Sequence, residues 1–247
     1  MERQLMPHLV NRLILPYFRT LVFGVLVCLL LSSCGSVPKP LRNLGKSDID
    51  FVMDVHTRQQ KQMMIRLTQK LYTRNPSQLK KSPGMTLEKR IEQIFGSPDE
   101  TELPSLIFDE LGGATSIDAV LLSFDEEFKG DRVFAAVVGL AEMLRRSYNH
   151  QQEFFILDSL DEQALYNSAR NIEVFVWRLY HRRDSNGDLY ILSNRLSEKD
   201  FDTSFDRLFA KMASVQDMMA LIVADKTDRG ITKVVHGVAQ FVFIPIP

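Results

Sequence analysis

The most apolar stretch in the body of the chain runs from Val133 to Leu144 (VFAAVVGLAEML), between the charged pairs Asp131-Arg132 and Arg145-Arg146. As a helix it would be about 18 Å long, which is too short to cross a hydrocarbon layer of about 30 Å. Such a stretch is typical of a helix buried at the centre of a helical domain. Ala135 and Gly139 lie four residues apart and would let a neighbouring helix approach closely. Insertion of this stretch into lipid is the alternative interpretation.

Most of the remaining chain shows apolar side chains at spacings of three and four residues, the pattern of amphipathic helices. Ser47 is the expected N-cap of a helix that ends near Thr73, before Asn75-Pro76. Ser159 begins a capping-box motif for a helix that extends to about His181. Further helices are expected over 86–95, 104–112, 115–128 and 198–224. The sequence therefore predicts a predominantly α-helical fold, a compact multi-helix domain.

Two stretches depart from the helical pattern. Asn186-Gly187 is a hairpin-turn signal, and residues 174–180 before it are β-branched and aromatic. We expect a helix, a loop and a short extended segment near 188–193, with a hairpin over 173–192 as the alternative. Pro245 and Pro247 exclude a helical C-terminus. The chain there is expected to be extended and packed across the helices, with an exposed strand for a partner as the alternative.

The N-terminus has a different character. Arg3, Arg12 and Arg19 stand against a single acid, Glu2, and an uncharged apolar run from Leu21 to Leu31 follows. In helical form this run would cover about 16 Å, roughly half of the hydrocarbon core of a bilayer. A cationic start, a short apolar run and small residues after it predict a signal peptide.

The run closes on Leu31-Ser32-Ser33-Cys34-Gly35, which resembles the lipobox of bacterial lipoproteins. The resemblance covers the first thirty-five residues and implies cleavage before Cys34 and acylation of its sulfur and its new amino group. Gly35, in place of Asp, implies transfer to the outer membrane, with the domain on the periplasmic face. The implied organisation is a signal peptide (1–33), a lipidated tether (34–46) and a single α-helical periplasmic domain (47–247). An uncleaved N-terminal anchor is the alternative.

Both cysteines of the chain, Cys28 and Cys34, lie in this N-terminal region. A domain without further cysteine excludes disulfides, thiol catalysis and thiolate metal sites, so its stability must come from an apolar core. The tether from Gly35 to Gly45 contains Pro38 and Pro40, which favour extended backbone. Its eleven residues reach at most ~35–40 Å and would keep the domain close to the membrane leaflet.

Charge is unevenly distributed along the chain. Residues 36–90 contain twelve basic and four acidic residues, whereas residues 91–131 contain one basic residue and eleven acids. The formal net charge of −1 does not indicate a nucleic-acid binder, so no nucleic acid is expected among the partners. The basic segment could face anionic lipid head groups or polymer phosphates. Alternatively, the two oppositely charged segments pack near each other.

Sequence motifs for catalysis do not stand out. The patterns G-x-S-x-G, H-E-x-x-H, repeated E-x-x-H and G-x-x-x-x-G-K do not occur. Asp184, Asn186 and Asp188 resemble the start of a calcium-binding loop, but Leu189 and Arg195 stand where that loop needs Gly and Glu. We therefore assign no catalytic, cofactor-binding or metal-binding residue and expect no cofactor.

These observations favour a non-catalytic scaffold or accessory subunit in cell-envelope assembly or maintenance. Its expected partners are the membrane, through the lipid anchor, and an envelope protein or peptidoglycan. The alternative is a periplasmic hydrolase acting on cell wall or glycan through paired carboxylates within residues 92–131. A cleft with two or more facing acids would favour the hydrolase, and a closed core with an exposed apolar patch would favour the scaffold.

Overall fold

The computed structural model describes residues 45–97, 103–194, 196–197, 200–201, 203–227, 230–231 and 242–246. Its helices are α3 (Asp48–Arg74), α4 (Pro76–Leu79), α5 (Leu87–Phe95), α6 (Ser116–Leu122), α7 (Arg132–Ser147), α8 (Glu162–His181) and α9 (Ser204–Thr227), with the short 3₁₀ helix η2 (Asp109–Leu111). Two strands of two residues each, β1 (Leu196–Ser197) and β2 (Asp200–Phe201), pair antiparallel. The predicted predominantly α-helical fold is confirmed.

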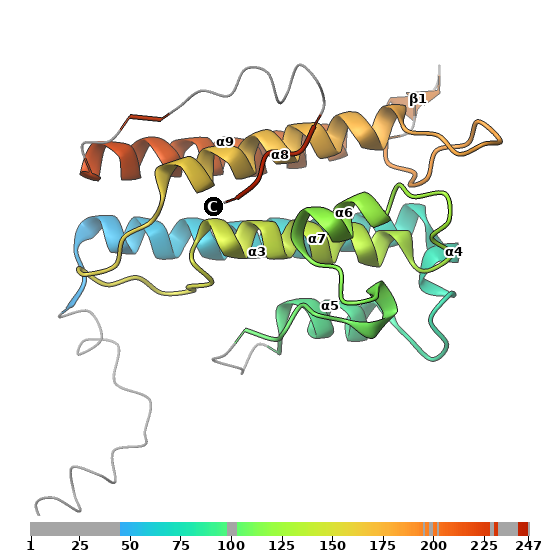
Figure 1. Cartoon of the computed structure of the whole chain (residues 1–247), viewed down its shortest axis with the longest axis horizontal. Helices are drawn as coiled ribbons and strands as arrows, with labels where there is room; N and C mark the ends of the chain where they lie inside the picture. The colour runs from blue at the N-terminus through green and yellow to red at the C-terminus, as the bar shows by residue number, and fades with distance from the viewer. Residues whose placement is uncertain are drawn as a thin grey trace, which may run out of the picture. The chain divides into compact units, whose positions relative to one another are not determined.

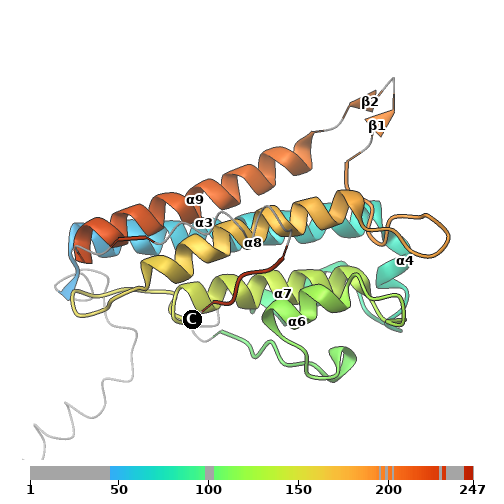
Figure 2. The same ribbon diagram turned by 45° about the horizontal axis from the view of Figure 1, so that its top comes forward.

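Four long helices form a bundle, in which α3 and α8 each pack against both α7 and α9. In Figure 1, α3 and α7 form one layer and α8 and α9 the other, and each long helix runs opposite to the next along the chain. The short helix α6 packs on α7, and α5 packs on both α3 and α7. Figure 2 shows the same four helices from a second direction.

Helix α7 lies at the centre of this packing, as its composition predicts. Most of its residues are buried, including Val133, Phe134, Val137 and Leu140, each with no exposed surface. A Cβ atom added at Gly139 would lie 2.6 Å from the carbonyl oxygen of Ser116 and from atoms of Val120. The predicted close approach is therefore confirmed, and α6 is the helix that makes it.

A buried polar cluster joins three of the long helices around Gln216 of α9. Its Nε2 donates to the hydroxyls of Ser147 on α7 (3.0 Å) and Ser168 on α8 (2.8 Å). Its Oε1 accepts a hydrogen bond of 2.6 Å from the hydroxyl of Tyr148. Because every one of these groups is buried, a shift of one helix along another would leave polar atoms without partners.

Several predicted helix boundaries are confirmed. Ser47 caps α3 in a capping box with Asp50, and Thr86 caps α5. Helix α8 extends to His181, so the helix is correct and the hairpin alternative over 173–192 is wrong. Beyond α8, Arg183 and Leu189 form an isolated bridge around the Asn186-Gly187 turn.

Two predicted helices are too long, and arginine side chains bind backbone carbonyl groups in the stretches that are not helical. Residues 104–108 are not helical, and the carbonyl oxygen of Pro104 accepts from Arg145 instead (2.7 Å). Helix α6 ends at Leu122 rather than near residue 128. Arg132 donates there to the carbonyl oxygens of Ser123 (3.1 Å) and Asp125 (2.6 Å).

The starts of α8 and α9 also differ from prediction. Asp161, not Ser159, is the N-cap of α8, since its Oδ1 accepts from the amides of Gln163 (2.7 Å) and Ala164 (3.1 Å). Helix α9 begins at Ser204, because the β1–β2 pair occupies part of the predicted helical span from residue 198.

The described C-terminal residues 242–246 are not helical and pack on the bundle. Phe243 and Ile246 are buried among core side chains, which confirms the packing interpretation for these residues. Phe241, with which the predicted extended segment begins, lies outside the described residues.

Candidate functional site

The predicted lipidation motif lies outside the described residues. Leu31, Ser32, Ser33, Cys34 and Gly35 all belong to residues 1–44, so their assignment stays a prediction. The described residues begin at Gly45, and the first charged residue among them is Lys46.

Lys46 connects the start of α3 to the loop between α7 and α8. Its ammonium group pairs with Asp54 on α3 and with Glu153 in the loop (2.9 Å), and its side chain is only 1% exposed. It also lies 5.8 Å from the ring centre of Phe51 and 4.9 Å from that of Phe155. Two acids and two aromatic rings thus stabilise a buried cation at the point where the tether joins the domain.

The loop residues next to this cluster are apolar and mostly exposed. Phe154 is fully buried, but Phe155, Ile156 and Leu157 are 38%, 63% and 94% exposed. Of these four consecutive apolar residues before α8, only Phe154 is buried. We call Phe155, Ile156 and Leu157 the apolar tip.

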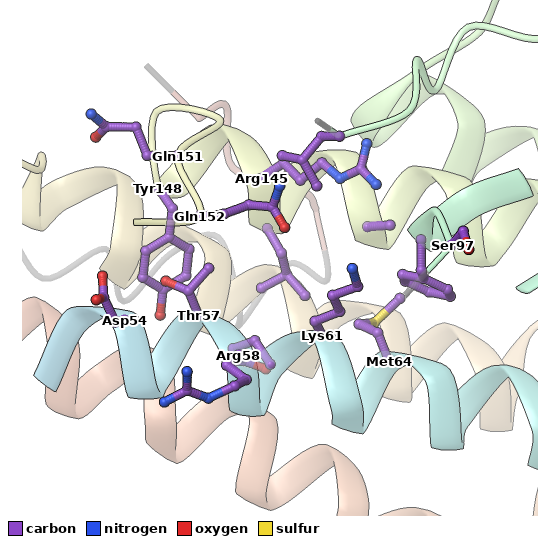
Figure 3. Close-up of a pocket in the computed structure, with 15 residues that line it drawn as sticks. Asp54, Thr57, Arg58, Lys61, Met64, Ser97, Arg145, Tyr148, Gln151 and Gln152 are labelled. Carbon is purple, nitrogen blue, oxygen red and sulfur yellow. The ribbon is translucent and has the colours of Figure 1, made fainter. Parts of the chain in front are cut away.

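A pocket of about 340 Å³ lies between α3 and the C-terminal end of α7. Figure 3 shows Thr57 and Lys61 pointing from α3 toward the side on which Tyr148 and Arg145 lie. The lining mixes apolar side chains with three cations and one acid: Met64, Phe95, Leu103, Ala141 and Leu144, then Arg58, Lys61 and Arg145, and Asp54.

Two charged groups of this pocket, Asp54 and Arg145, have structural partners. Asp54 accepts from the amide of Phe154 (2.8 Å) and from Lys46, so both of its carboxylate oxygens are in use. Arg145 donates to the carbonyl oxygens of Pro104 (2.7 Å) and Ile94, and burial lowers its pKa. Only the Oε1 of Gln60 is a buried acceptor without a protein partner in this lining. Asp54 is the only acid in the described lining, so the pocket contains no facing pair of acids there.

Two acids of the segment 91–131 do come together, on the buried guanidinium of Arg90. Glu110 accepts from Arg90 at 2.6 and 2.9 Å, and Asp131 lies 3.9 Å from the same Arg90. Asp131 also accepts from Tyr72 (2.8 Å) and from the amide of Phe134 (2.9 Å). This contact between the basic and acidic segments agrees with the packing interpretation of their charges.

The protonation of these two acids follows their surroundings. The hydrogen bond from Arg90 holds the pKa of Glu110 below its ordinary value. Burial raises the pKa of Asp131, although its hydrogen bonds and Arg90 oppose this. Burial and the neighbouring Asp131 carboxylate raise the pKa of Tyr72. Since both oxygens of Asp131 hold structural donors, the cluster fixes α3, α5 and the start of α7 and offers no free base.

Metal sites and membrane spans can be judged only in the described ranges. There, no group of three or more His, Cys, Asp or Glu side chains is arranged to hold a metal ion. No helix in the same ranges combines the length and the apolar character needed to cross a membrane.

No protein family, curated protein or solved structure matches the chain.

Sequence reasoning missed the residues that gather around Lys46. Lys46 stands alone before a helix cap, and its partners lie 8 and 107 residues further along the chain, at Asp54 and Glu153. A signal for the apolar tip was present, because three apolar residues occupy a connection between helices, where polar residues are usual.

Proposed function

We propose that the protein is an outer-membrane-anchored periplasmic lipoprotein that acts as a non-catalytic scaffold or accessory subunit in cell-envelope assembly or maintenance. The observation that carries the proposal is the order of features at the N-terminus. A cationic start precedes the apolar run Leu21–Leu31, and the lipobox-like residues around Cys34 follow directly.

The helical domain supports a binding role over chemistry. Its core is closed around α7, and the acids Glu110 and Asp131 are bound to a buried arginine. An apolar surface, formed by Phe155, Ile156 and Leu157, lies beside Lys46. These are the features by which a scaffold was distinguished from a hydrolase above.

A lipid anchor also explains how weak contacts would be sufficient for such a role. Several acyl chains on one cysteine hold a protein at a membrane, because each buried methylene contributes ~0.8 kcal/mol. A short tether then confines the domain to one surface and raises its effective concentration toward an envelope protein or peptidoglycan.

The mass of the intact protein, isolated from bacterial membranes after expression of the full chain, tests the anchor. We expect a polypeptide that begins at Cys34 and carries acyl mass on that residue. Cys34→Ala should abolish both cleavage and acylation, and Cys28→Ala, the matched control, should change neither. A wild-type protein that retains Met1 and lacks acyl mass would overturn the proposal.

The scaffold role is tested by crosslinking in cells. The acylated protein should form reproducible crosslinks to envelope components that decrease when Cys34→Ala removes the anchor. Hydrolysis of purified peptidoglycan or glycan by the isolated protein, lost on substitution of Glu110 or Asp131 without unfolding, would favour the hydrolase instead.

A further inference from the structure

We infer that the apolar tip, Phe155, Ile156 and Leu157, inserts into the interfacial layer of the same phospholipid membrane that holds Cys34. The N-terminal end of α3 then faces the lipid, and the opposite end of the bundle points away from it. The inference deepens the proposed function and rests on it, since the acyl anchor supplies the membrane.

The tip is a closed turn that presents its apolar side chains outward. The amide of Asp158 donates to the carbonyl oxygen of Phe155 (2.8 Å), and the amide of Phe155 donates back to the Asp158 carboxylate (2.8 Å). Ile156 and Leu157 are therefore the two central residues of a turn held at both ends. Those positions usually hold Gly, Pro, Asn, Asp or Ser, so two exposed aliphatic residues there indicate a binding surface.

The tip also lies where the anchor must attach. The amide of Phe154 is bonded to Asp54, and the Lys46 ammonium contacts the rings of Phe51 and Phe155. The loop thus lies beside the first turns of α3, as Figures 1 and 2 both show. The tether enters the domain at Lys46, and its eleven preceding residues reach no more than ~40 Å from Cys34.

The end of the bundle at Asn75 and Leu192 lies far from Lys46 and the apolar tip. Asn75, which follows α3, exchanges two hydrogen bonds of 2.8 Å with the backbone of Leu192. Helix α3 has 27 residues and is therefore about 40 Å long. Leu192 is 51% exposed and marks the end far from the tether, so it serves as a matched control for the tip.

The chemistry favours apolar contact with lipid over attraction to anionic head groups. Lys46, whose ammonium group lies 4.9 Å from the ring centre of Phe155, is already paired with Asp54 and Glu153. The tip carries two aliphatic side chains and one aromatic ring, the groups that bury at the head-group and acyl boundary. A small convex turn suits a soft interface, whereas a protein partner would need a much larger complementary surface.

The experiment uses the single tryptophan of the chain, Trp177. In a Trp177→Phe background, Leu157→Trp and Leu192→Trp place one reporter at either end of the bundle. Each protein is expressed as the full chain, isolated in its acylated form and reconstituted in vesicles of phosphatidylethanolamine and phosphatidylglycerol that contain bromine-labelled acyl chains. We expect bromine to quench the emission of Leu157→Trp and to leave that of Leu192→Trp unchanged. Equal quenching of both reporters, or none at Leu157→Trp, would overturn the inference.

A second variant separates insertion from misfolding. Ile156→Asp, added to the Leu157→Trp reporter, should lower the ratio of inserted to free tips about tenfold, as loss of one buried aliphatic side chain predicts. Circular dichroism should show the same helical content with and without Ile156→Asp. Quenching that persists in the folded Ile156→Asp protein would contradict insertion of the tip.

The mass of each preparation keeps the two proposals distinguishable. An acylated protein with an unquenched tip would refute only the insertion. A chain without acyl mass whose tip is nevertheless quenched by vesicles would refute the anchor and leave the insertion standing. Replacing phosphatidylglycerol by phosphatidylcholine should not reduce the quenching, and a reduction would contradict the apolar mode of contact.

Discussion

Asn171, buried on α8, exchanges two hydrogen bonds with the backbone of Ile244, 73 residues further along the chain. Its Nδ2 donates to the carbonyl oxygen at 2.7 Å, and its Oδ1 accepts from the amide at 2.7 Å. One side chain thus satisfies both the amide and the carbonyl group of Ile244. Phe243 and Ile246, on either side, bury their side chains in the core.

Substitution at Asn171 should therefore release the C-terminal segment. Asn171→Ala leaves a partly buried amide and carbonyl group of Ile244 without their protein partner and should lower the free energy of unfolding by ~1–2 kcal/mol. Asn171→Asp should cost more, because a carboxylate oxygen would then face the Ile244 carbonyl. Chemical denaturation measures both effects, with the exposed Gln62→Ala as the control. A smaller loss for Asp than for Ala would contradict the hydrogen-bond assignment.

The second prediction concerns acid stability and Glu110. Because Arg90 lowers the folded-state pKa of Glu110, this group stabilises the fold above its unfolded pKa near 4.5. The contribution is lost as the pH falls through the lower folded pKa. Glu110→Gln should thus be less stable than the wild type near neutral pH, and the difference should shrink as the pH falls from about 5 to 3.

Comparing Glu110→Gln with the wild type separates the contribution of Glu110 to acid stability from that of the neighbouring Asp131. Burial raises the folded pKa of Asp131, so its protonation acts in the opposite direction as the pH falls. Asp131 is present in both proteins, so its contribution to the free energy of unfolding cancels to first order when the two are compared. Unfolding free energies from urea titrations at several pH values provide the measurement. A difference that grows toward low pH would contradict the Arg90–Glu110 pairing.

The third prediction concerns the contact between α6 and α7. Gly139→Ala would gain about 1 kcal/mol in helix propensity at an unconstrained site. Here the new methyl group would meet the Ser116 carbonyl oxygen and the Val120 backbone at 2.6 Å, and backbone atoms cannot simply rotate away. We expect a net loss of ~1–3 kcal/mol, measured by thermal or chemical unfolding. Gly230→Ala, where a methyl group would meet nothing within 4 Å, is the control and should be neutral.

The sequence predicts elements whose causes are local. The spacing of apolar residues and the Ser47 capping box correctly predict α3, and the composition of residues 133–144 correctly predicts a buried α7. The predicted helix start at residue 104 and the predicted helix end near residue 128 were wrong. The carbonyl groups of Pro104 and Ser123 there accept hydrogen bonds from the side chains of Arg145 and Arg132 instead.

The candidate site likewise contains one feature with a local cause, which the sequence predicts, and features that depend on tertiary contacts, which it does not. The lipidation motif is a linear signal, so the sequence alone suggests it, although it lies outside the described residues. The Lys46 cluster joins side chains that are about a hundred residues apart in the chain, so no local sequence pattern predicts it. The apolar tip becomes recognisable only when Phe154 is seen to be buried and its three successors are not.

The last prediction decides between the two N-caps considered for α8. The sequence motif favours Ser159, whereas the structure assigns the cap to Asp161, whose Oδ1 accepts from two amides of the first helical turn. A charged cap also interacts favourably with the positive end of the helix. Asp161→Ala should therefore lower the free energy of unfolding by ~1 kcal/mol, whereas Ser159→Ala, at an exposed position, should change it by less than ~0.5 kcal/mol. Asp161→Asn keeps an acceptor and should recover most of the loss. The reverse order, with Ser159→Ala the more damaging, would mean that α8 begins two residues earlier and that the turn after the apolar tip is shorter than the structure shows.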